Sequence, residues 1–374
     1  MTLAATVLVG VTVAVAALAR AERGRRAMRA GLPERERHFG LLAGEPAAEG
    51  LRRVALGQLD LAIELLAGES TVSPDDEAVH ETRKALKRLR ALLRLLEDAL
   101  GPGRAARERA VVREAASRLA GARDAEVMVG TLDALVRRHP RRLGRRRGVI
   151  ELRAHLERER VAAAARALGA ADRSATPALN GWAEERALPT AERTHAAAEL
   201  SALRDRVASW TLPDRPVGKL VDSGLVRVYR EGRVRFGRAA ARKPSPTALH
   251  RWRKHVKDLR YVAEVLDVQS APDADAARAT TSGDGRLAKL ARRADALGEL
   301  LGEEHDLALL AELARTDKRL QRRKRARRAL LRTIARRRAR LRERALRAGG
   351  RLYARKPKRF VRRMRASYQP TLRP

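Results

Sequence analysis

Two stretches of the chain repeat one pattern of basic residues. The stretches that begin at His80 and His250 both read H-x-x-R-K-x-x-K-x-L-R, with an offset of 170 positions. Arg and Lys side chains donate charge-assisted hydrogen bonds to phosphate oxygens, and His adds a donor that gains charge on protonation. The basic residues that the two copies share are His80, Arg83, Lys84, Lys87 and Arg90, and His250, Arg253, Lys254, Lys257 and Arg260. The pattern predicts a site for a ligand with regularly spaced negative charges, and binding is expected to strengthen below about pH 6.5 as histidine protonates.

A second pair of segments follows the two motifs. The segment from Leu119 to Asp124 matches the segment from Leu301 to Asp306, with an offset of 182 positions. This match places Arg123 where the second copy has His305, so both join the candidate binding residues. The chain therefore reads as two copies of one helical unit.

The histidines leave open a metal-dependent phosphohydrolase site. His305 and Asp306 would have to converge on a cation together with His250 and His80. Arg123 stands at the equivalent of His305 in the first copy, and a guanidinium beside a metal ion would be repelled. The sequence therefore favours binding without catalysis, and no catalytic residue, metal or cofactor is expected.

A helical conformation gives each motif a basic face and an apolar face. At about 100° per residue, the basic residues of the first copy fall on one side together with Arg94. The opposite sides are apolar in both copies, with Leu86, Leu89, Leu93 and Leu96, and Val256, Leu259, Ala263 and Leu266. Tyr261 is expected near the basic face and His255 in the core. An ordinary solvated face is the alternative, but like charges at i and i+4 are mildly destabilising and here the same set occurs twice.

The elements that position these residues are predicted to be helices. Apolar residues recur every three or four positions and no stretch alternates like a strand, so the fold class is all-α. The first motif helix is expected to begin after Ser73 and to run to Leu100, and Ser245 is expected to start the second. Linkers rich in Pro, Gly and polar residues are predicted at 211–218 and 269–285.

Composition narrows the function classes. The chain has 374 residues, 82 Lys and Arg against 45 Asp and Glu, and a formal net charge of +37. The absence of cysteine excludes disulfides, thiolate metal sites and a cysteine nucleophile. Aromatic residues make up only 3%, which disfavours a base-stacking surface, and the tryptophans at 182, 210 and 252 are expected in the core. The charge predicts a polyanionic partner: nucleic acid, an anionic membrane or polyphosphate.

The two ends of the chain carry separate signals. Residues 1–19 contain no charged residue and precede a run of arginines, which predicts a membrane anchor with the domain in the cytoplasm. A docked N-terminal helix and a translation start at Met28 are the alternatives. Residues 318–347 contain 16 Lys and Arg and one acid, Glu343. This basic helix is expected to extend the anion site, to contact nucleic acid or to lie on an anionic membrane. A solvated helix without a specific partner is the alternative. Residues 355–365 are expected to fray.

The paired motifs and the paired R-D and H-D segments resemble the CHAD family, the conserved histidine α-helical domain, over roughly residues 35–365. The resemblance implies two pseudo-symmetric helical bundles, non-catalytic binding of inorganic polyphosphate through the His, Arg and Lys residues above, and association with polyphosphate granules in the cytoplasm. CHAD domains often follow a CYTH triphosphatase domain with an E-x-E-x-K strand. The stretches at Glu34 and Glu157 lack the Lys, so a stand-alone CHAD protein is predicted.

The expected domain organisation follows from these assignments. Residues 1–30 form the hydrophobic segment with its basic flank, and residues 35–365 form the CHAD domain, with a tail at 366–374. The first half covers about 45–210 and the second about 218–365. Two rival functions remain at this point: general nucleic-acid binding, and a metal-dependent phosphohydrolase acting on polyphosphate.

Overall fold

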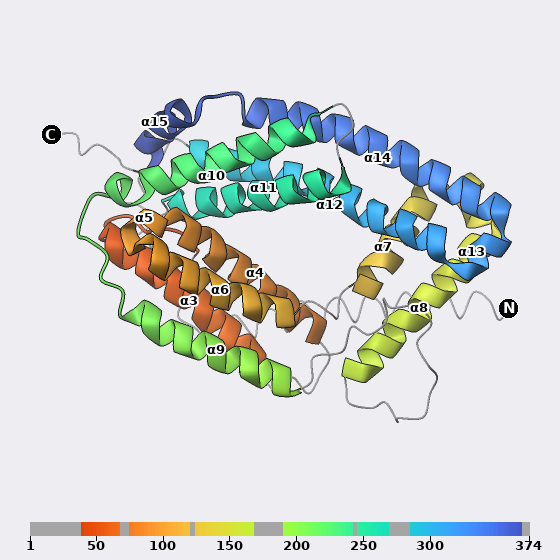
Figure 1. Cartoon of the computed structure of the whole chain (residues 1–374), viewed down its shortest axis with the longest axis horizontal. Helices are drawn as coiled ribbons and strands as arrows, with labels where there is room; N and C mark the ends of the chain where they lie inside the picture. The colour runs from red at the N-terminus through yellow and green to blue at the C-terminus, as the bar shows by residue number, and fades with distance from the viewer. Residues whose placement is uncertain are drawn as a thin grey trace, which may run out of the picture.

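The structure, a computed structural model, describes residues 39–67, 75–119, 124–167, 190–241, 245–268 and 285–368 (Figure 1). The regular elements within these ranges are helices, so the chain has the all-α fold that its periodicity predicts. In chain order they are α3 (Ala47–Ala67), α4 (Asp75–Leu95), α5 (Glu97–Leu100), α6 (Pro102–Arg118), α7 (Asp124–Arg138), the π-helical turn η1 (Pro140–Gly144), α8 (Arg147–Ala167), α9 (Thr190–Ala208), α10 (Val217–Ala239), α11 (Pro246–Leu266), α12 (Arg286–Thr316), α13 (Lys318–Arg322), α14 (Lys324–Leu352) and α15 (Pro357–Tyr368).

Most of the helices pack in two groups. Helices α3, α4, α6 and α9 pack against one another, and α10, α11, α12 and α14 form the second group, with α15 lying on α10. The groups meet where α4 contacts α10 and α11 (Figure 1). The connection between α9 and α10 covers residues 209–216 and so overlaps the linker predicted at 211–218, although the last two residues of the predicted range belong to α10.

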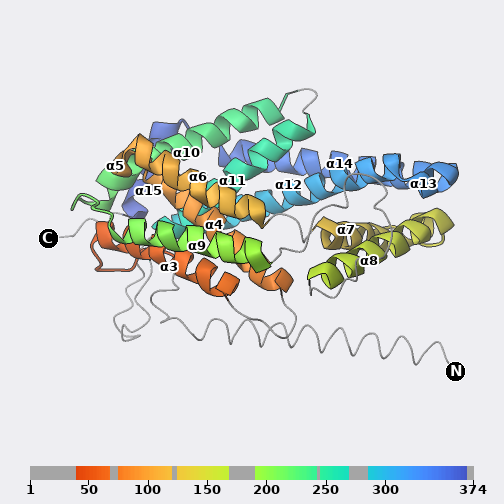
Figure 2. The same ribbon diagram turned by 60° about the horizontal axis from the view of Figure 1, so that its bottom comes forward.

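Helices α7 and α8 leave the first group. They pack instead with the far ends of α12 and α14 (Figure 2). This packing buries a separate apolar cluster that includes Leu132 and Leu152 together with Leu310 and Leu330. A simple division of the sequence into two halves did not predict this exchange of helices.

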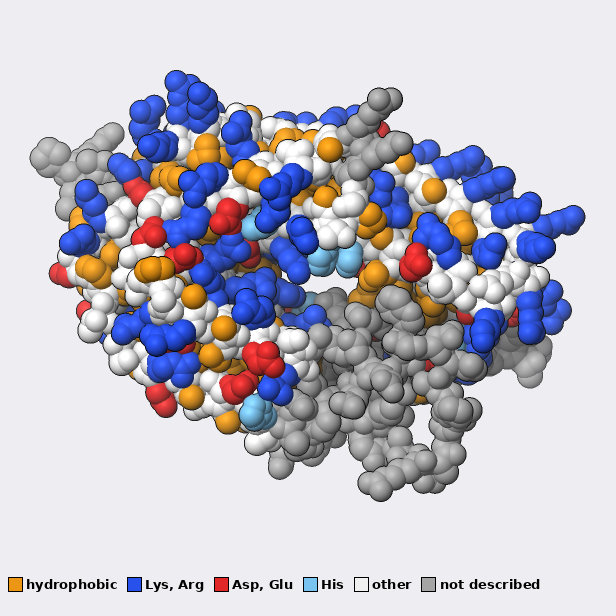
Figure 3. All heavy atoms as spheres, in the orientation of Figure 1, with side chains coloured by type: hydrophobic (Ala, Val, Ile, Leu, Met, Phe, Trp, Pro, Cys, Tyr) orange, Lys and Arg blue, Asp and Glu red, His pale blue; other side chains and the backbone are white. Residues whose placement is uncertain are grey.

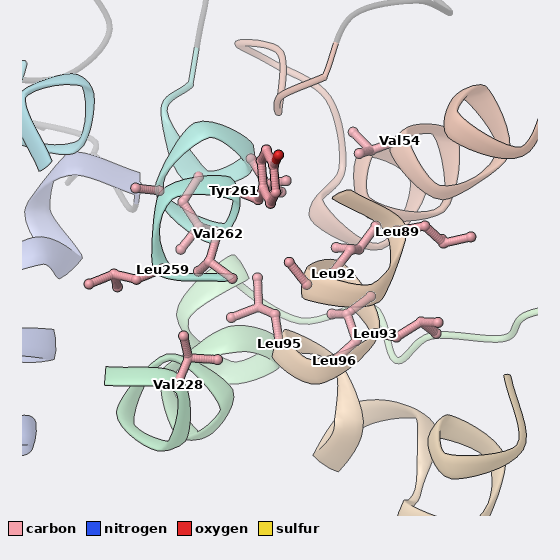
Figure 4. Packing of buried hydrophobic residues seen from close by; sticks show 14 of the residues in the cluster. Val54, Leu89, Leu92, Leu93, Leu95, Leu96, Val228, Leu259, Tyr261 and Val262 are labelled. Atoms are coloured by element: carbon pink, nitrogen blue, oxygen red, sulfur yellow. The ribbon is translucent and has the colours of Figure 1, made fainter. Parts of the chain in front are cut away.

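The apolar faces of the motif helices form the centre of the main core. All eight residues predicted for these faces are buried. In Figure 4, Leu95 of α4 faces Val228 of α10 and the α11 residues Leu259 and Val262, and all of these residues belong to one buried cluster with Leu92. The basic residues of the two motif helices therefore lie on the sides that face away from this core. Trp210 and Trp252 are buried as expected, and Trp182 lies outside the described residues.

The first motif helix does not run unbroken to Leu100. Helix α4 ends at Leu95, and the short α5 follows after a bend at Leu96. Helix α10 crosses α4 at this point so closely that a Cβ atom on Gly224 would overlap the carbonyl oxygen of Leu95. The bend therefore coincides with a backbone-to-backbone contact that the sequence pattern alone does not reveal.

One expectation about the C-terminal half was wrong. Residues 355–365 do not fray, because α15 buries Phe360, Val361 and Met364 against the core and extends to Tyr368, into the range predicted as a tail.

Tyr261 lies near the basic face, as expected, with the Arg260 guanidinium 5.6 Å from the centre of its ring. It is only 5% exposed, and its ring makes an edge contact with Phe39 at 6.5 Å between centroids.

No helix in the ranges that the structure describes is long and apolar enough to cross a membrane. The predicted anchor at residues 1–19 lies outside the described residues.

Candidate functional site

The candidate site is the polar side of the two motif helices. We call it the motif face, and it comprises His80, Arg83, Lys84, Lys87, Arg90 and Arg94 of α4, His250, Arg253, Lys254, Lys257 and Arg260 of α11, and His305 of α12. Lys254 is exposed, and the other residues of the motif face are half-buried. Arg123, the remaining candidate from the sequence, lies outside the described residues.

Two ion pairs join α4 to α11 where the helices cross. Arg94 Nη1 lies 3.4 Å from Asp258 Oδ2, and Arg88 Nη2 lies 3.7 Å from Glu264 Oε2. Positions 94 and 264 are equivalent in the repeat, and so are positions 88 and 258, because both pairs differ by 170. The same ion pair is therefore made twice with its charges exchanged, as expected for helices related by a two-fold axis.

Asp258 was missed in the sequence analysis although it organises this crossing. The residue is 3% exposed, and Arg90 Nη2 lies 4.0 Å from its carboxylate. Burial raises the pKa of Asp258, and the nearby Arg94 and Arg90 oppose that shift. The sequence does contain a signal for this residue, because equivalent positions of the two copies carry opposite charges. Arg88 corresponds to Asp258, and Arg94 corresponds to Glu264.

The central arginine of each motif contacts the helix that follows. Arg83 Nη1 donates a hydrogen bond to the carbonyl oxygen of Leu119 at 3.3 Å, where α6 ends. Arg253 lies over Gly302 of α12, with Nη2 3.1 Å from the place that a Cβ atom would occupy. Gly302 is equivalent to position 120 through the offset of 182. Both arginines are thus held at matching places, one by a helix end and one by a glycine.

Acidic side chains reduce the charge of part of the motif face. Lys84 Nζ lies 3.1 Å from Glu81, and Arg260 Nε donates a hydrogen bond to Glu264 at 2.6 Å and also pairs through Nη1 with Asp295. Helical-wheel reasoning from the motif residues alone did not predict these acids. The basic side predicted from the sequence is therefore not uniformly positive, because neighbouring acids compensate part of its charge.

His255 does not lie in the core as expected. Its side chain is 14% exposed, and Nδ1 lies 3.6 Å from Glu231 of α10, a carboxylate that also pairs with Arg94. Burial, followed by the nearby Arg94 and Arg235, lowers the pKa of His255 to about 4. Glu231 explains the difference, because this acid of α10 pairs with a polar residue of each motif helix, Arg94 and His255.

Two histidines of the motif face stack on each other. The rings of His250 and His305 have centroids 4.4 Å apart and planes inclined by 34°. Burial, followed by His305, Lys254 and Arg253, lowers the pKa of His250 to about 4. His250 is therefore neutral at pH 7, and the expectation of protonation near pH 6.5 was wrong for this residue.

The end of the motif face near His250 has buried nitrogens without partners. His250 Nδ1 and Arg253 Nε are buried and have no hydrogen-bond partner among the residues that the structure describes. Burial and then the neighbouring Arg253 lower the pKa of Lys257, Glu299 and Asp295 oppose that shift, and Lys254 is exposed beside them. Buried nitrogens without partners are uncommon in folded proteins. This group of residues can accept an anionic ligand whose oxygens supply the absent partners.

The surface is hollowed in the middle of the molecule. Figure 3 shows a narrow opening with Lys and Arg side chains on one side and His side chains above it. In the same orientation, the helices around the opening are α4, α11, α12 and α7 (Figure 1). The opening is thus bordered by helices of both motifs.

Comparison with known proteins identifies the family. Residues 57–315 match the CHAD domain. The chain belongs to the CHAD family. A solved structure with the same fold is the CHAD domain from the plant Ricinus communis, with a TM-score of 0.54 and 20% identity over 87% of this chain and 98% of that one. PptA from Streptomyces chartreusis was also found, with a TM-score of 0.45 and 17% identity over 83% of this chain and all of that chain. No curated protein matches the sequence.

The resemblance stated from the motifs is therefore confirmed. No CYTH domain is detected in this chain. The family is linked to polyphosphate binding.

The metal-site alternative gains no support from the geometry of the CHAD domain. Within the described ranges, no three His, Asp or Glu side chains come together in a group that could hold a metal ion. His250 and His305 are close, but their neighbours are the cations Lys254 and Arg253. A cation would be repelled at this place.

His250 and His255, both half-buried, make the stability of the CHAD domain pH-dependent. Their folded pKa values are about 4, below the ordinary 6.5, so the unfolded chain binds protons first as the pH falls. This contribution to stability is fully present above about pH 6.5 and is lost toward pH 4, by roughly 1–2 kcal/mol for each histidine because solvent screens partly exposed groups. Urea unfolding at a series of pH values measures this loss. The double variant His250→Gln, His255→Gln should flatten the dependence, whereas His195→Gln, at an exposed site, should not. A variant curve parallel to that of the natural protein would contradict the assignment.

Proposed function

We propose that this CHAD domain binds inorganic polyphosphate on the motif face without catalysis. The observation that carries the proposal is the pair of buried nitrogens without partners at the His250 end. There, His250 Nδ1 and Arg253 Nε lack partners, and Lys257 and Lys254 add charge beside them. Phosphate oxygens would supply both the hydrogen-bond acceptors and the negative charge that these side chains lack.

The acids of the motif face fit this role as positioning groups. Asp258 and Glu231 pair with Arg94, and Asp258 also lies near Arg90. These contacts fix the arginine side chains before a ligand arrives, which lowers the entropy lost on binding. We therefore place the main ligand contacts at His250, Arg253, Lys254 and Lys257, and a supporting role at the arginines near Asp258.

Polyphosphate fits the motif face better than nucleic acid does. The cations of the motif face other than Lys254 are half-buried, and a single chain of phosphates is much thinner than a duplex and can reach them. The chain has few aromatic residues, so a surface for stacking bases is not supported. Binding is expected to weaken steeply with salt, because the cations of the site release counterions from the polyanion.

The cellular setting follows from the proposed ligand. We place the protein in the cytoplasm, at polyphosphate granules, with membrane anchorage through residues 1–19 as the alternative. The rival phosphohydrolase would release phosphate in a reaction that a metal chelator blocks and that depends on His305. Phosphate release with both properties would replace the binding proposal.

The two central arginines test the site. The double variant Arg83→Met, Arg253→Met keeps apolar stems against Leu119 and Gly302 but removes both guanidinium groups. We expect polyphosphate affinity to fall about 100-fold or more, since a hydrogen bond to a charged group contributes roughly 1.5–3 kcal/mol. Isothermal titration with polyphosphate of defined length measures the change.

A matched variant controls for the loss of net charge. Arg113 on α6 and Arg251 on α11 are both exposed, one in each half of the chain, and their replacement by Met also removes two charges. This control should lose less than about tenfold in affinity, as expected for charges that act only at long range. Equal losses in the two variants would remove the motif face from the site.

A further inference from the structure

Helix α14 carries a second concentration of positive charge, away from the motif face. Among its 29 residues are thirteen Lys and Arg and one acid, Glu343. Six arginines that follow one another at intervals of three or four positions are exposed: Arg325, Arg328, Arg332, Arg336, Arg340 and Arg344. At about 100° per residue these six fall within roughly half of the helix circumference. We call this row the outer face of α14.

The arginines on the other side of α14 are occupied by acids. Arg337 makes two hydrogen bonds of 2.7 Å to the carboxylate of Glu303 on α12. Arg338 and Arg342 donate to Glu304, a residue that is 2% exposed, at 3.0 and 2.8 Å. Helix α12 therefore neutralises the inner arginines. Of the outer-face arginines, Arg344 lies close enough to Glu303 to lower the pKa of that carboxylate, and the four arginines from Arg328 to Arg340 carry the remaining charge.

The packing of α14 disfavours a membrane as the partner of the outer face. Surface helices bind membranes by inserting an apolar face between the lipids. The apolar residues of α14, including Leu330, Ile334 and Leu341, are buried in the protein. The outer face can therefore attract a polyanion only through its charge.

The shape of α14 favours a wide, rigid polyanion. The helix is about 43 Å long, somewhat more than the 34–36 Å of one turn of duplex DNA. It lies along an edge of the molecule, and in the view of Figure 1 no other described helix lies beyond it on that side. A duplex can approach such an edge, whereas the cations of the motif face other than Lys254 are half-buried. Arginine also suits this partner, because its planar group binds phosphate with two hydrogen bonds.

We propose that the outer face of α14 is a sequence-independent binding surface for duplex nucleic acid, separate from the motif face. The surface contacts phosphates along the duplex and reads no bases. The protein then has two polyanion surfaces of different shape, so polyphosphate and a duplex bind at the same time. This inference does not depend on the proposed function of the motif face, because different residues carry it.

The test measures binding of the full chain to a labelled mixed-sequence DNA duplex of about three helical turns. The variant Arg328→Gln, Arg332→Gln, Arg336→Gln, Arg340→Gln removes four exposed charges while keeping good helix-forming residues. Fluorescence anisotropy over a series of salt concentrations should show a fall in affinity of tenfold or more. The slope of log K against log salt should become less negative by about 3–4, since each lost phosphate contact contributes about 0.9.

Two further variants make the result specific. Replacing the same four arginines by Lys keeps the charge and should retain most of the salt slope. Replacing four exposed arginines elsewhere by Gln, at 104, 107, 113 and 230, removes the same net charge and should change duplex affinity much less. Polyphosphate affinity should be alike in this control and in the variant of the outer face.

Three results would overturn the inference. One is a control that weakens duplex binding as much as the variant of the outer face does. Another is an equal loss of polyphosphate and duplex affinity in the outer-face variant, which would make α14 part of one general anion surface. The third is a loss confined to vesicles of anionic phospholipid, which would assign the outer face to membranes.

Discussion

Gly224→Ala is expected to lower the free energy of unfolding by about 3 kcal/mol. The added methyl group would overlap the Leu95 carbonyl oxygen, and the Leu95 carbonyl carbon and Cα also lie close. These are backbone atoms, so no side-chain rotation relieves the clash. Helix α10 must move away from α4, and that movement opens the core in which Leu92, Leu95 and Val228 meet (Figure 4).

Gly237→Ala is the matched control, because Gly237 lies in the same helix with no atom within 4 Å of its added Cβ. Removing a glycine from a helix lowers the conformational entropy of the unfolded chain, so this change should be neutral or should stabilise by up to about 1 kcal/mol. Urea unfolding monitored by circular dichroism compares the two. Similar unfolding free energies for both variants would show that α4 and α10 do not meet at Gly224.

Glu304→Ala is expected to destabilise the protein by about 3–5 kcal/mol. The Glu304 carboxylate is 2% exposed and accepts hydrogen bonds from Arg338 and Arg342 of α14. Removing it leaves two partly buried guanidinium groups in a helix that already contains thirteen Lys and Arg. The contact between α12 and α14 should then weaken, and with it the apolar cluster that these helices share with α7 and α8.

The control for this change is Glu343→Ala on α14 itself. The Glu343 side chain is 64% exposed and pairs with Arg347 at 2.8 Å. An exposed pair of this kind contributes about 0–1 kcal/mol, so the control should hardly change thermal unfolding. If loss of Glu304 cost no more than loss of Glu343, the buried ion pairs would not be what joins α12 to α14.

The sequence was sufficient for those parts of the fold that depend on periodicity. Leu89 and Leu259 are buried because apolar residues at helical spacing must face a core, whatever that core contains. The bend at Leu96 and the contact at Gly224 depend on where a distant helix passes, so they could not be read from local pattern. The same holds for α7 and α8, whose partners lie in the other half of the chain.

The positions of the motif residues on their helices could be predicted from the sequence, whereas the charges around them could not. The spacing of the motif correctly placed Arg83 and Arg253 on the polar sides of two helices. It did not reveal that Asp258 and Glu231 would meet Arg94, because those acids lie on other turns and on another helix. Histidine protonation was also misjudged, since burial and nearby cations lower the pKa of His250 to about 4. Comparing the charges of the two copies, position by position, recovers the part of this information that the sequence does contain.

The most direct test of the central claim is a titration of the full chain with long-chain polyphosphate at near-physiological salt, with and without saturating duplex DNA. The proposed function predicts tight binding of polyphosphate that excess duplex does not displace, since the two ligands are assigned to the motif face and to α14. Stoichiometric displacement of polyphosphate by the duplex would contradict it. The protein, with its net charge of +37, would then bind both polyanions at one shared surface without specificity. The assignment of the motif face to polyphosphate would be withdrawn.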